Sequence, residues 1–233
     1  MGSGDPLDEF QERIGYRFRN LLLLRQAITH PSYINEHPRE ETGDNQRLEF
    51  LGDAVLDFVA GTWIYHRYPH FSEGQMTRLR AALVCSGTLA RLARQLGLGR
   101  VLRLGRGEDE SGGRERDTIL GDAFEALVGA LYLDGGIHTV TSFAEPLIEP
   151  LAEEIQRREA DVDAKSRLQE WSQGVLGITP RYRIVAETGP DHARTFVAEV
   201  LLGDRVVGQG EGRSKQAAEQ AAARAAWTAV VGK

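Results

Sequence analysis

Apolar residues recur at helical spacing through the first two thirds of the chain. The clearest run, at intervals of three, four, three and one residues, is Leu48, Leu51, Val55, Phe58 and Val59, which places these side chains on one face of a helix. Nothing in residues 7–156 alternates between apolar and polar positions as a strand does. The pattern predicts an all-α domain over 7–156, with helices at about 7–14, 20–28, 45–67, 73–95, 115–134 and 138–158.

The pattern changes after residues 157–163, a charged segment almost free of apolar side chains that is predicted to be a linker. A helix is predicted at 165–176, followed by β-rich runs at 182–185, 195–200 and 205–208 and an Ala-rich helix at about 214–230. This α-β-β-β-α order predicts a small α+β domain over 164–232, with both helices on one face of the sheet.

Length and composition narrow the class of protein. The 233 residues, 41% of them hydrophobic, are enough for one sizeable core and a small second domain. No apolar run approaches the roughly 18 residues of a membrane span, and the first residues lack a basic start followed by an apolar stretch. We therefore expect a cytoplasmic protein without a membrane segment. Cys85 is the only cysteine, which excludes an intramolecular disulfide and a thiolate metal cluster.

Charge is distributed unevenly along the chain. The net charge of -6 divides into -8 over residues 1–162 and +2 over residues 163–233. An acidic first part suits a carboxylate metal site, and a mildly basic second part can meet phosphates. Unrelated surface variation explains this asymmetry equally well.

Glu49 and Asp53 form the strongest chemical signal. Four residues apart on a predicted helix, their carboxylates lie on one face, while Leu48, Leu51 and Val55 point elsewhere. Two like charges at this spacing destabilise a helix unless a positive group lies between them.

A second acidic pair, Asp122 and Glu125, lies three residues apart on another predicted helix, among small and apolar residues. Four carboxylates converging from two packed helices would form an all-oxygen site for a hard cation such as Mg²⁺. The alternative, two solvated helix faces, is weakened because lysine is absent from residues 1–162 and the flanking residues are apolar.

Other chemistries find little support in the sequence. Neither acidic pair contains the Glu-x-x-His pattern of helical di-iron sites. Ser86 and Cys85 have no nearby base that would activate a nucleophile. His30 and His66 are expected to make structural hydrogen bonds.

Four segments carry a resemblance to a known family. They are NQRLEFLGDAVL at Asn45–Leu56, THPSY at Thr29–Tyr33, FSEG at Phe71–Gly74 and GDAFEA at Gly121–Ala126. In this order, and followed by an α-β-β-β-α domain, they resemble the ribonuclease III family in its compact bacterial form. The resemblance spans nearly the whole chain and implies an all-α endonuclease domain followed by a double-stranded-RNA-binding domain.

The resemblance also implies a reaction and a site. It assigns Glu49, Asp122 and Glu125 to Mg²⁺, for which Mn²⁺ can substitute, and makes Asp53 and Glu125 the catalytic residues. Water would cleave both strands of double-stranded RNA, leaving 5′-phosphate and 3′-hydroxyl ends with two-nucleotide 3′ overhangs. No organic cofactor is implied. The implied substrates are ribosomal RNA precursors and some messenger and transfer RNA precursors.

The resemblance further implies a homodimer whose interface includes the helix with the first acidic pair. Phe50 and Leu51 are candidates for that interface, and core packing is the equal alternative for both. In the second domain, it places Gln169 and Gln173 in one minor groove and His192 near the ribose of a second. Arg213, Ser214 and Lys215 would bind phosphate at the start of the last helix.

Two positions depart from the family pattern. Gln46 stands where the family usually has Glu, and its neutral amide cannot supply a negative charge to an accessory metal. Gln216 stands where a second basic residue is common, so one phosphate contact is lost. Two other classes of protein are alternatives: a protein that binds double-stranded RNA without cutting it, and a helical phosphohydrolase of small phosphate esters, which would not need the second domain.

Overall fold

The computed structural model describes residues 5–162, 164–190 and 194–230. The chain forms two compact units, Met1–Glu153 and Glu154–Lys233, each described here by itself. Asp163 of the predicted linker, His192 of the predicted RNA-binding set and residues 231–232 of the predicted second domain lie outside the described residues.

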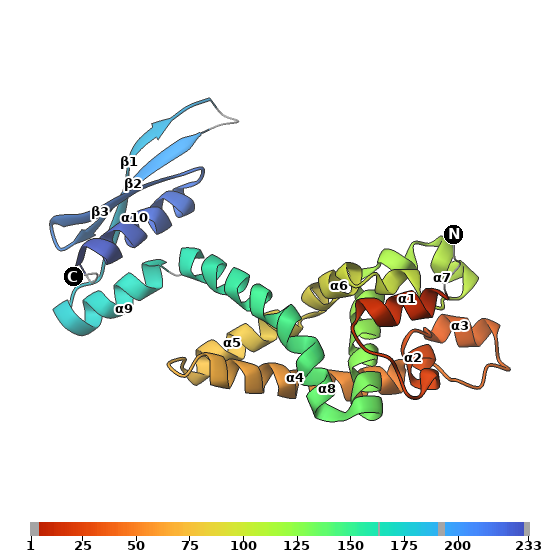
Figure 1. The fold of residues 1–233 in the computed structure, drawn as a ribbon. Helices are drawn as coiled ribbons and strands as arrows, with labels where there is room; N and C mark the ends of the chain where they lie inside the picture. The colour runs from red at the N-terminus through yellow and green to blue at the C-terminus, as the bar shows by residue number, and fades with distance from the viewer. Residues whose placement is uncertain (1–4, 163, 191–193, 231–233) are drawn as a thin grey trace. The chain divides into compact units, whose positions relative to one another are not determined.

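The first unit is all-α, as predicted (Figure 1). Its helices and 3₁₀ turns are α1 (Pro6–Arg13), α2 (Leu21–Ala27), α3 (Pro31–Glu36), α4 (Gln46–Arg67), α5 (Glu73–Val84), α6 (Ser86–Gln95), η1 (Leu98–Arg100), α7 (Arg106–Glu110), η2 (Gly113–Glu115) and α8 (Asp117–Val162), the last of which continues into the second unit. The one isolated β-bridge recorded among the described residues joins Thr29 to Arg103.

Two helices differ from the prediction in ways that local chemistry explains. The single helix expected over 73–95 is α5 and α6, separated by extended backbone at Cys85. The Thr88 hydroxyl donates to the carbonyl of Ala82 over 2.8 Å, so a side chain satisfies a C-terminal carbonyl of α5. Residues 157–162 of the predicted linker continue α8 as a helix.

Helix α8 contains a kink between the two helices predicted at 115–134 and 138–158. Gly136 has φ +77°, a backbone conformation that favours glycine. Just before the kink, the Asp134 carboxylate accepts hydrogen bonds from the backbone N–H of Arg19 and Asn20 and from the Tyr16 hydroxyl. These bonds tie the turn of α8 to the loop before α2.

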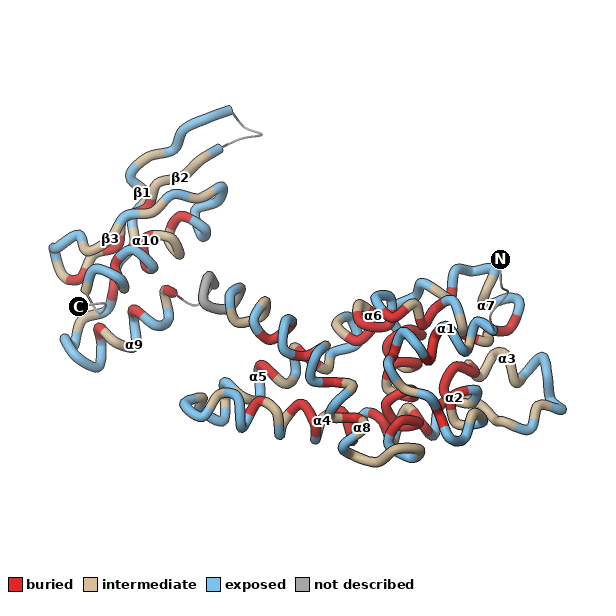
Figure 2. The backbone as a smooth tube through the Cα atoms, in the orientation of Figure 1, coloured by how far each residue is buried: buried red, intermediate tan, exposed pale blue. Residues whose placement is uncertain are grey.

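The first arm of α8 is the centre of the core (Figure 2). From Ile119 to Leu131 every residue is buried except Asp122 and Glu125, which are half-buried. Helix α4 contacts this arm at Gly52 and Leu48, and its side chains Leu48, Val55, Leu56 and Val59 are also buried. Two acidic side chains therefore interrupt an otherwise buried stretch of α8.

Helices α4 and α8 cross with their backbones in contact. A Cβ atom on Gly52 would lie 1.7 Å from the carbonyl oxygen of Glu125, and one on Gly129 would lie 2.3 Å from that of Leu48. Because both obstacles are backbone atoms, no rotamer change could relieve the clash. The two glycines thus set how closely the two acid-bearing helices approach.

The second unit has the predicted α-β-β-β-α order. It comprises α9 (Ala164–Leu176), β1 (Arg181–Thr188), β2 (Thr195–Leu202), β3 (Arg205–Gly212) and α10 (Lys215–Val230), with an antiparallel sheet in the order β1-β2-β3. Its core is built from small residues of α10, namely Ala218, Ala222, Ala223 and Ala226, with Leu168, Ala198 and Val200. Glycines 208, 210 and 212 of β3 face α10, where a Cβ atom would meet backbone atoms within 2.5 Å.

No helix in the described part of the chain is both long and apolar enough to cross a membrane.

Replacing Gly52 with alanine should destabilise the first unit by about 3 kcal/mol, because the new methyl group meets the α8 backbone. Gly61→Ala is the matched control on the same helix, since its Cβ would lie 3.8 Å from the nearest atom, Cδ of Arg80. Alanine there should stabilise the helix by up to about 1 kcal/mol. Differential scanning calorimetry of both variants tests this, and equal transition temperatures would contradict the close crossing.

Candidate active site

Three carboxylates from α4 and α8 converge on one point. Oxygen atoms of Glu49, Asp122 and Glu125 all lie within 4.8 Å of one another, and the three residues are half-buried. Asp53, one turn beyond Glu49 on α4, is exposed and is not part of this group. The structure therefore brings three of the four predicted acids together and leaves the fourth beside them, on the solvent side.

The local sequence explains this convergence. The spacings of four and three residues keep each acidic pair on one helix face. Gly52 lies between Glu49 and Asp53 and contacts the backbone of Glu125 itself. The point where the two backbones touch is thus also the point where the acids face each other.

The cluster is short of positive charge. Burial is the largest cause that raises the pKa of Glu125, to about 7, and the charges of Asp53, Asp122, Glu49 and Asp57 raise it further. Burial, then the charge of Asp122, likewise raises the pKa of Glu49. None of the ion pairs recorded in the described residues involves Glu49, Asp53, Asp122 or Glu125.

His30 lies near this cluster. Its Nδ1 accepts the backbone N–H of Ser32 over 3.2 Å and lies 2.8 Å from the Ser32 hydroxyl, so the ring caps α3. Burial raises the pKa of Asp122, and the nearby His30 lowers it. The sequence motif predicted a structural role for His30 but did not indicate that the ring lies near Asp122.

The cluster has the donor set of a hard-cation site. It offers carboxylate oxygens alone, which Mg²⁺, Mn²⁺ and Ca²⁺ accept, and no thiolate or imidazole lies among the grouped ligands. A cation bound there would relieve the repulsion that raises the pKa of Glu125. The residues present therefore fit a metal ion.

Helix α4 presents a row of apolar side chains to solvent. Phe50 is 82% exposed, Phe58 61% and Tyr65 65%, at spacings of eight and seven residues. The side chain of Phe50 therefore does not pack in the core of its own chain, and that alternative is wrong for this residue. Leu51 is half-buried.

The predicted RNA-binding residues that are described lie at the surface of the second unit. Gln169 and Gln173 are exposed one turn apart on α9, and Gln173 donates to the Thr179 hydroxyl over 3.1 Å. Arg213, Ser214 and Lys215 are exposed where α10 begins. The Ser214 hydroxyl accepts the backbone N–H of Ala217 over 3.1 Å, so it serves as a helix cap.

Comparisons with known proteins match both units. Residues 20–151 match the family described as Ribonuclease-III-like, and residues 164–229 match the double-stranded RNA binding motif. A protein named Ribonuclease 3 from Listeria monocytogenes is 45% identical over 93% of this chain and 94% of its own length. Another from Symbiobacterium thermophilum is 49% identical over 92% of this chain and 90% of its own length.

A solved structure agrees with the first unit. The nuclease domain of ribonuclease III from Campylobacter jejuni matches 62% of this chain and 96% of that chain, with 38% identity and a TM-score of 0.57. That nuclease domain shows structural flexibility in a region involved in dimer formation.

A helical nuclease domain with a carboxylate site, followed by a domain that binds double-stranded RNA, defines an endoribonuclease of double-stranded RNA. Identity of 45–49% over more than nine tenths of the chain narrows the class further. The chain belongs to the ribonuclease III family.

The raised pKa of Glu125 predicts a pH-dependent effect of Glu125→Gln on metal-free protein. The pKa is about 7 in the folded chain, against an ordinary value of 4.5, so ionisation between these values destabilises the fold as pH rises. Glutamine removes this charge. In EDTA, the variant should therefore have a higher melting temperature than wild type at pH 8 and nearly the same one at pH 5.

The control for this pH effect is Glu145→Gln, on the exposed surface of the same helix. It should change the melting temperature equally little at both pH values. A Glu125→Gln variant whose melting temperature follows wild type from pH 5 to pH 8 would show that Glu125 is not repelled by its neighbours.

Proposed function

We propose that the chain hydrolyses both strands of double-stranded RNA in a Mg²⁺-dependent reaction, leaving 5′-phosphate and 3′-hydroxyl ends with two-nucleotide 3′ overhangs. The observation that carries this proposal is the half-buried group of Glu49, Asp122 and Glu125, which lacks a recorded cationic partner. It lies in a chain whose second unit matches a double-stranded RNA binding motif.

In the proposed reaction, Glu49, Asp122 and Glu125 hold Mg²⁺, and Mn²⁺ can replace it. When bound, the metal supplies a water of lowered pKa and offsets negative charge on the reacting phosphate. Asp53 is exposed beside the cluster, where its carboxylate can accept a hydrogen bond from the attacking water and orient it. We assign the catalytic roles to Asp53 and Glu125.

We also propose that the chain acts as a homodimer through α4. Phe50, Phe58 and Tyr65 leave large apolar surfaces in water along one side of this helix. A second copy would cover them, and the description of the Campylobacter domain names a dimer-forming region. In such a dimer, two copies of the acidic cluster can act on the two strands of one duplex.

For RNA recognition we propose the exposed surface residues of the second unit. Gln169 and Gln173 can reach 2′-hydroxyls and base edges of a minor groove. At the start of α10, Arg213 and Lys215 supply charge and the first backbone N–H groups face a phosphate. Ser214 contributes as the cap that shapes this turn, and His192 is assigned to the second groove.

The proposed cellular role is processing of ribosomal RNA precursors and of some messenger and transfer RNA precursors in the cytoplasm. The pairing of a duplex-binding unit with a nuclease unit supports long, base-paired precursors as substrates.

A labelled perfect RNA duplex of about 30 base pairs, long enough for one binding domain and a cleavage site, tests the proposal. Wild-type protein should cleave it in Mg²⁺ and bind without cleavage in Ca²⁺ or EDTA. Glu125→Gln should slow cleavage by more than about a hundredfold, because a metal ligand and its charge are lost. Gel-shift affinity for the duplex should stay unchanged.

Glu145→Gln, on an exposed part of α8, is the control and should cleave at the wild-type rate. Mapping the ends by sequencing gels tests the stagger and the 5′-phosphate. Cleavage by wild type in EDTA, or by Glu125→Gln at full rate, would contradict the metal-site assignment.

Phe50→Glu should raise the dissociation constant of the dimer by at least about tenfold, because it places a charge where apolar surface would be covered. Sedimentation velocity over a concentration series measures this. Leu22→Glu is the control, since Leu22 is an apolar residue of α2 that is 57% exposed and lies outside the α4 row. A monomeric wild type, or an unchanged Phe50→Glu dimer, would contradict the assignment of this surface.

A further inference from the structure

Arg103 lies outside the acidic cluster but joins the segments that lead to it. It follows η1 and precedes α7, while its partners come from the end of α2, from α3 and from the loop before α4. Its side chain is three-quarters buried, which is unusual for an arginine.

The guanidinium group of Arg103 uses several donors at once. It pairs with the carboxylate of Glu40 and donates to the hydroxyls of Thr29 over 3.3 Å and Thr42 over 3.5 Å. Its Cζ atom lies over the ring of Tyr33, 4.2 Å from the ring centroid. The Arg103 hydrogen bond is the largest cause that lowers the pKa of Glu40. The planar guanidinium group can contact all of these partners at the same time, which a lysine ammonium group cannot do.

Thr29 connects Arg103 to the helix that carries the first acidic pair. Thr29 is fully buried, and its backbone forms the β-bridge with Arg103. The carbonyl of Thr29 accepts the N–H of Asn45 over 2.9 Å, and the carbonyl of Asn45 accepts the N–H of Glu49 over 2.9 Å. A series of hydrogen bonds through Thr29 and Asn45 thus links the guanidinium group to the backbone N–H of Glu49, the residue that carries the first metal-site carboxylate.

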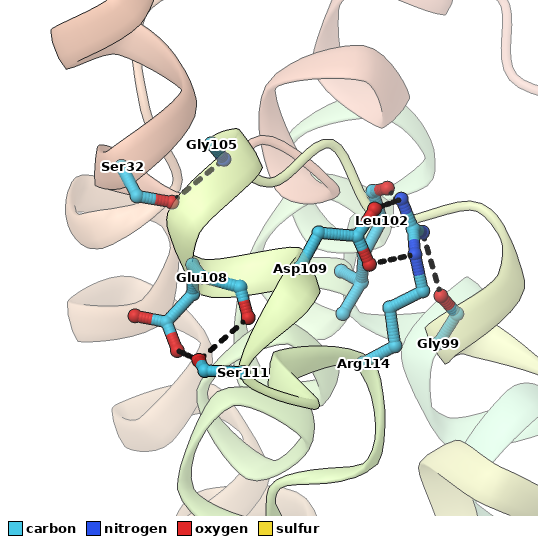
Figure 3. A network of polar contacts seen from close by, with 8 residues as sticks. All are labelled: Ser32, Gly99, Leu102, Gly105, Glu108, Asp109, Ser111 and Arg114. Carbon is cyan, nitrogen blue, oxygen red and sulfur yellow. Dashed lines mark hydrogen bonds and ion pairs between the residues drawn. The ribbon is translucent and has the colours of Figure 1, made fainter.

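Further bonds hold the segment around Arg103 in place. The Ser32 hydroxyl accepts the backbone N–H of Gly105 over 2.9 Å (Figure 3), and the Glu36 carboxylate accepts that of Arg106 over 3.0 Å. Gly105 itself packs against the backbone of Ser32, where a Cβ atom would lie 2.6 Å from the carbonyl oxygen. Together with the bonds of the Arg103 backbone itself, whose N–H donates to Ile28 and whose carbonyl accepts from His30, these contacts fix the backbone that presents the Arg103 side chain.

We propose that Arg103 is a positioning residue for the metal site: by holding Thr29 and the 40–45 loop, it fixes the first turn of α4 and with it the Glu49 carboxylate. Metal ligands must be held to within fractions of an ångström, and residues behind the ligands supply that constraint. The proposal rests on the metal-dependent reaction proposed above and adds a residue that contacts neither metal nor RNA.

The test compares wild type with Arg103→Met and Arg103→Lys. Mn²⁺ binding to RNA-free protein is measured by the electron paramagnetic resonance signal of free Mn²⁺. The dissociation constant for Mn²⁺ should rise by about tenfold in Arg103→Met. It should rise by less in Arg103→Lys, which keeps the positive charge but loses the planar guanidinium group. In cleavage assays, kcat should fall and the midpoint Mg²⁺ concentration should rise, while KM for the duplex stays unchanged.

Arg114→Met is the matched control. Arg114 also bonds at several points, to the Asp109 carboxylate through two nitrogens and to the carbonyls of Gly99 and Leu102 (Figure 3), and none of its hydrogen bonds among the described residues reaches Thr29. Its loss should lower the melting temperature and leave Mn²⁺ affinity unchanged.

The outcomes distinguish a positioning role of Arg103 from a purely structural one. If Arg103→Met lowers the melting temperature but keeps wild-type Mn²⁺ affinity and Mg²⁺ midpoint, Arg103 is only structural and the proposal fails. An equal loss of affinity in Arg114→Met would also overturn it. If Arg103→Met does not fold, Arg103→Lys decides by the same criteria. A wild type that neither binds Mn²⁺ nor cleaves in Mg²⁺ would instead overturn the proposed function.

Discussion

The close crossing of α4 and α8 is the constraint on which the site depends. At Gly52 and Gly129 the two backbones touch, and any side chain there would meet carbonyl oxygens. The crossing brings together acids that are more than 70 residues apart in sequence and buries them enough to raise the pKa values of Glu49, Asp122 and Glu125. Packing and electrostatics are therefore set at the same contact, and neither can change without the other.

Carboxylates held this way oppose folding in the absence of a cation, since burial and mutual repulsion both disfavour ionisation. The surrounding structure compensates with the stretch of α8 from Ile119 to Leu131, in which every residue except the two acids is buried. Burial of the apolar side chains around the acids thus holds the mutually repelling carboxylates in place. This arrangement is typical of sites where local stability is given up for chemistry.

Much of this architecture follows from local sequence. Helical spacing was enough to place each acidic pair on one face, and the shift from helical to alternating periodicity separated the two fold classes. Local pattern did not predict the break at Cys85, where the Thr88 side chain competes with the helix backbone. It also missed the glycine crossing and the partners of Arg103, because these contacts join residues 61 to 81 positions apart. Asp53 was grouped with the other acids by spacing alone, although it lies on the solvent side.

The glycines of β3 and the alanines of α10 have a consequence for how the second unit can diverge among relatives. Each glycine opposes backbone atoms of the helix, so enlarging either surface alone would push sheet and helix apart. Substitutions at these glycines or alanines must therefore occur in compensating pairs, or the helix must move relative to the sheet. The described residues that we propose to contact RNA, Gln169, Gln173, Arg213, Ser214 and Lys215, are exposed and lie outside this contact. Substrate preference can therefore drift between lineages while the scaffold beneath it stays almost invariant.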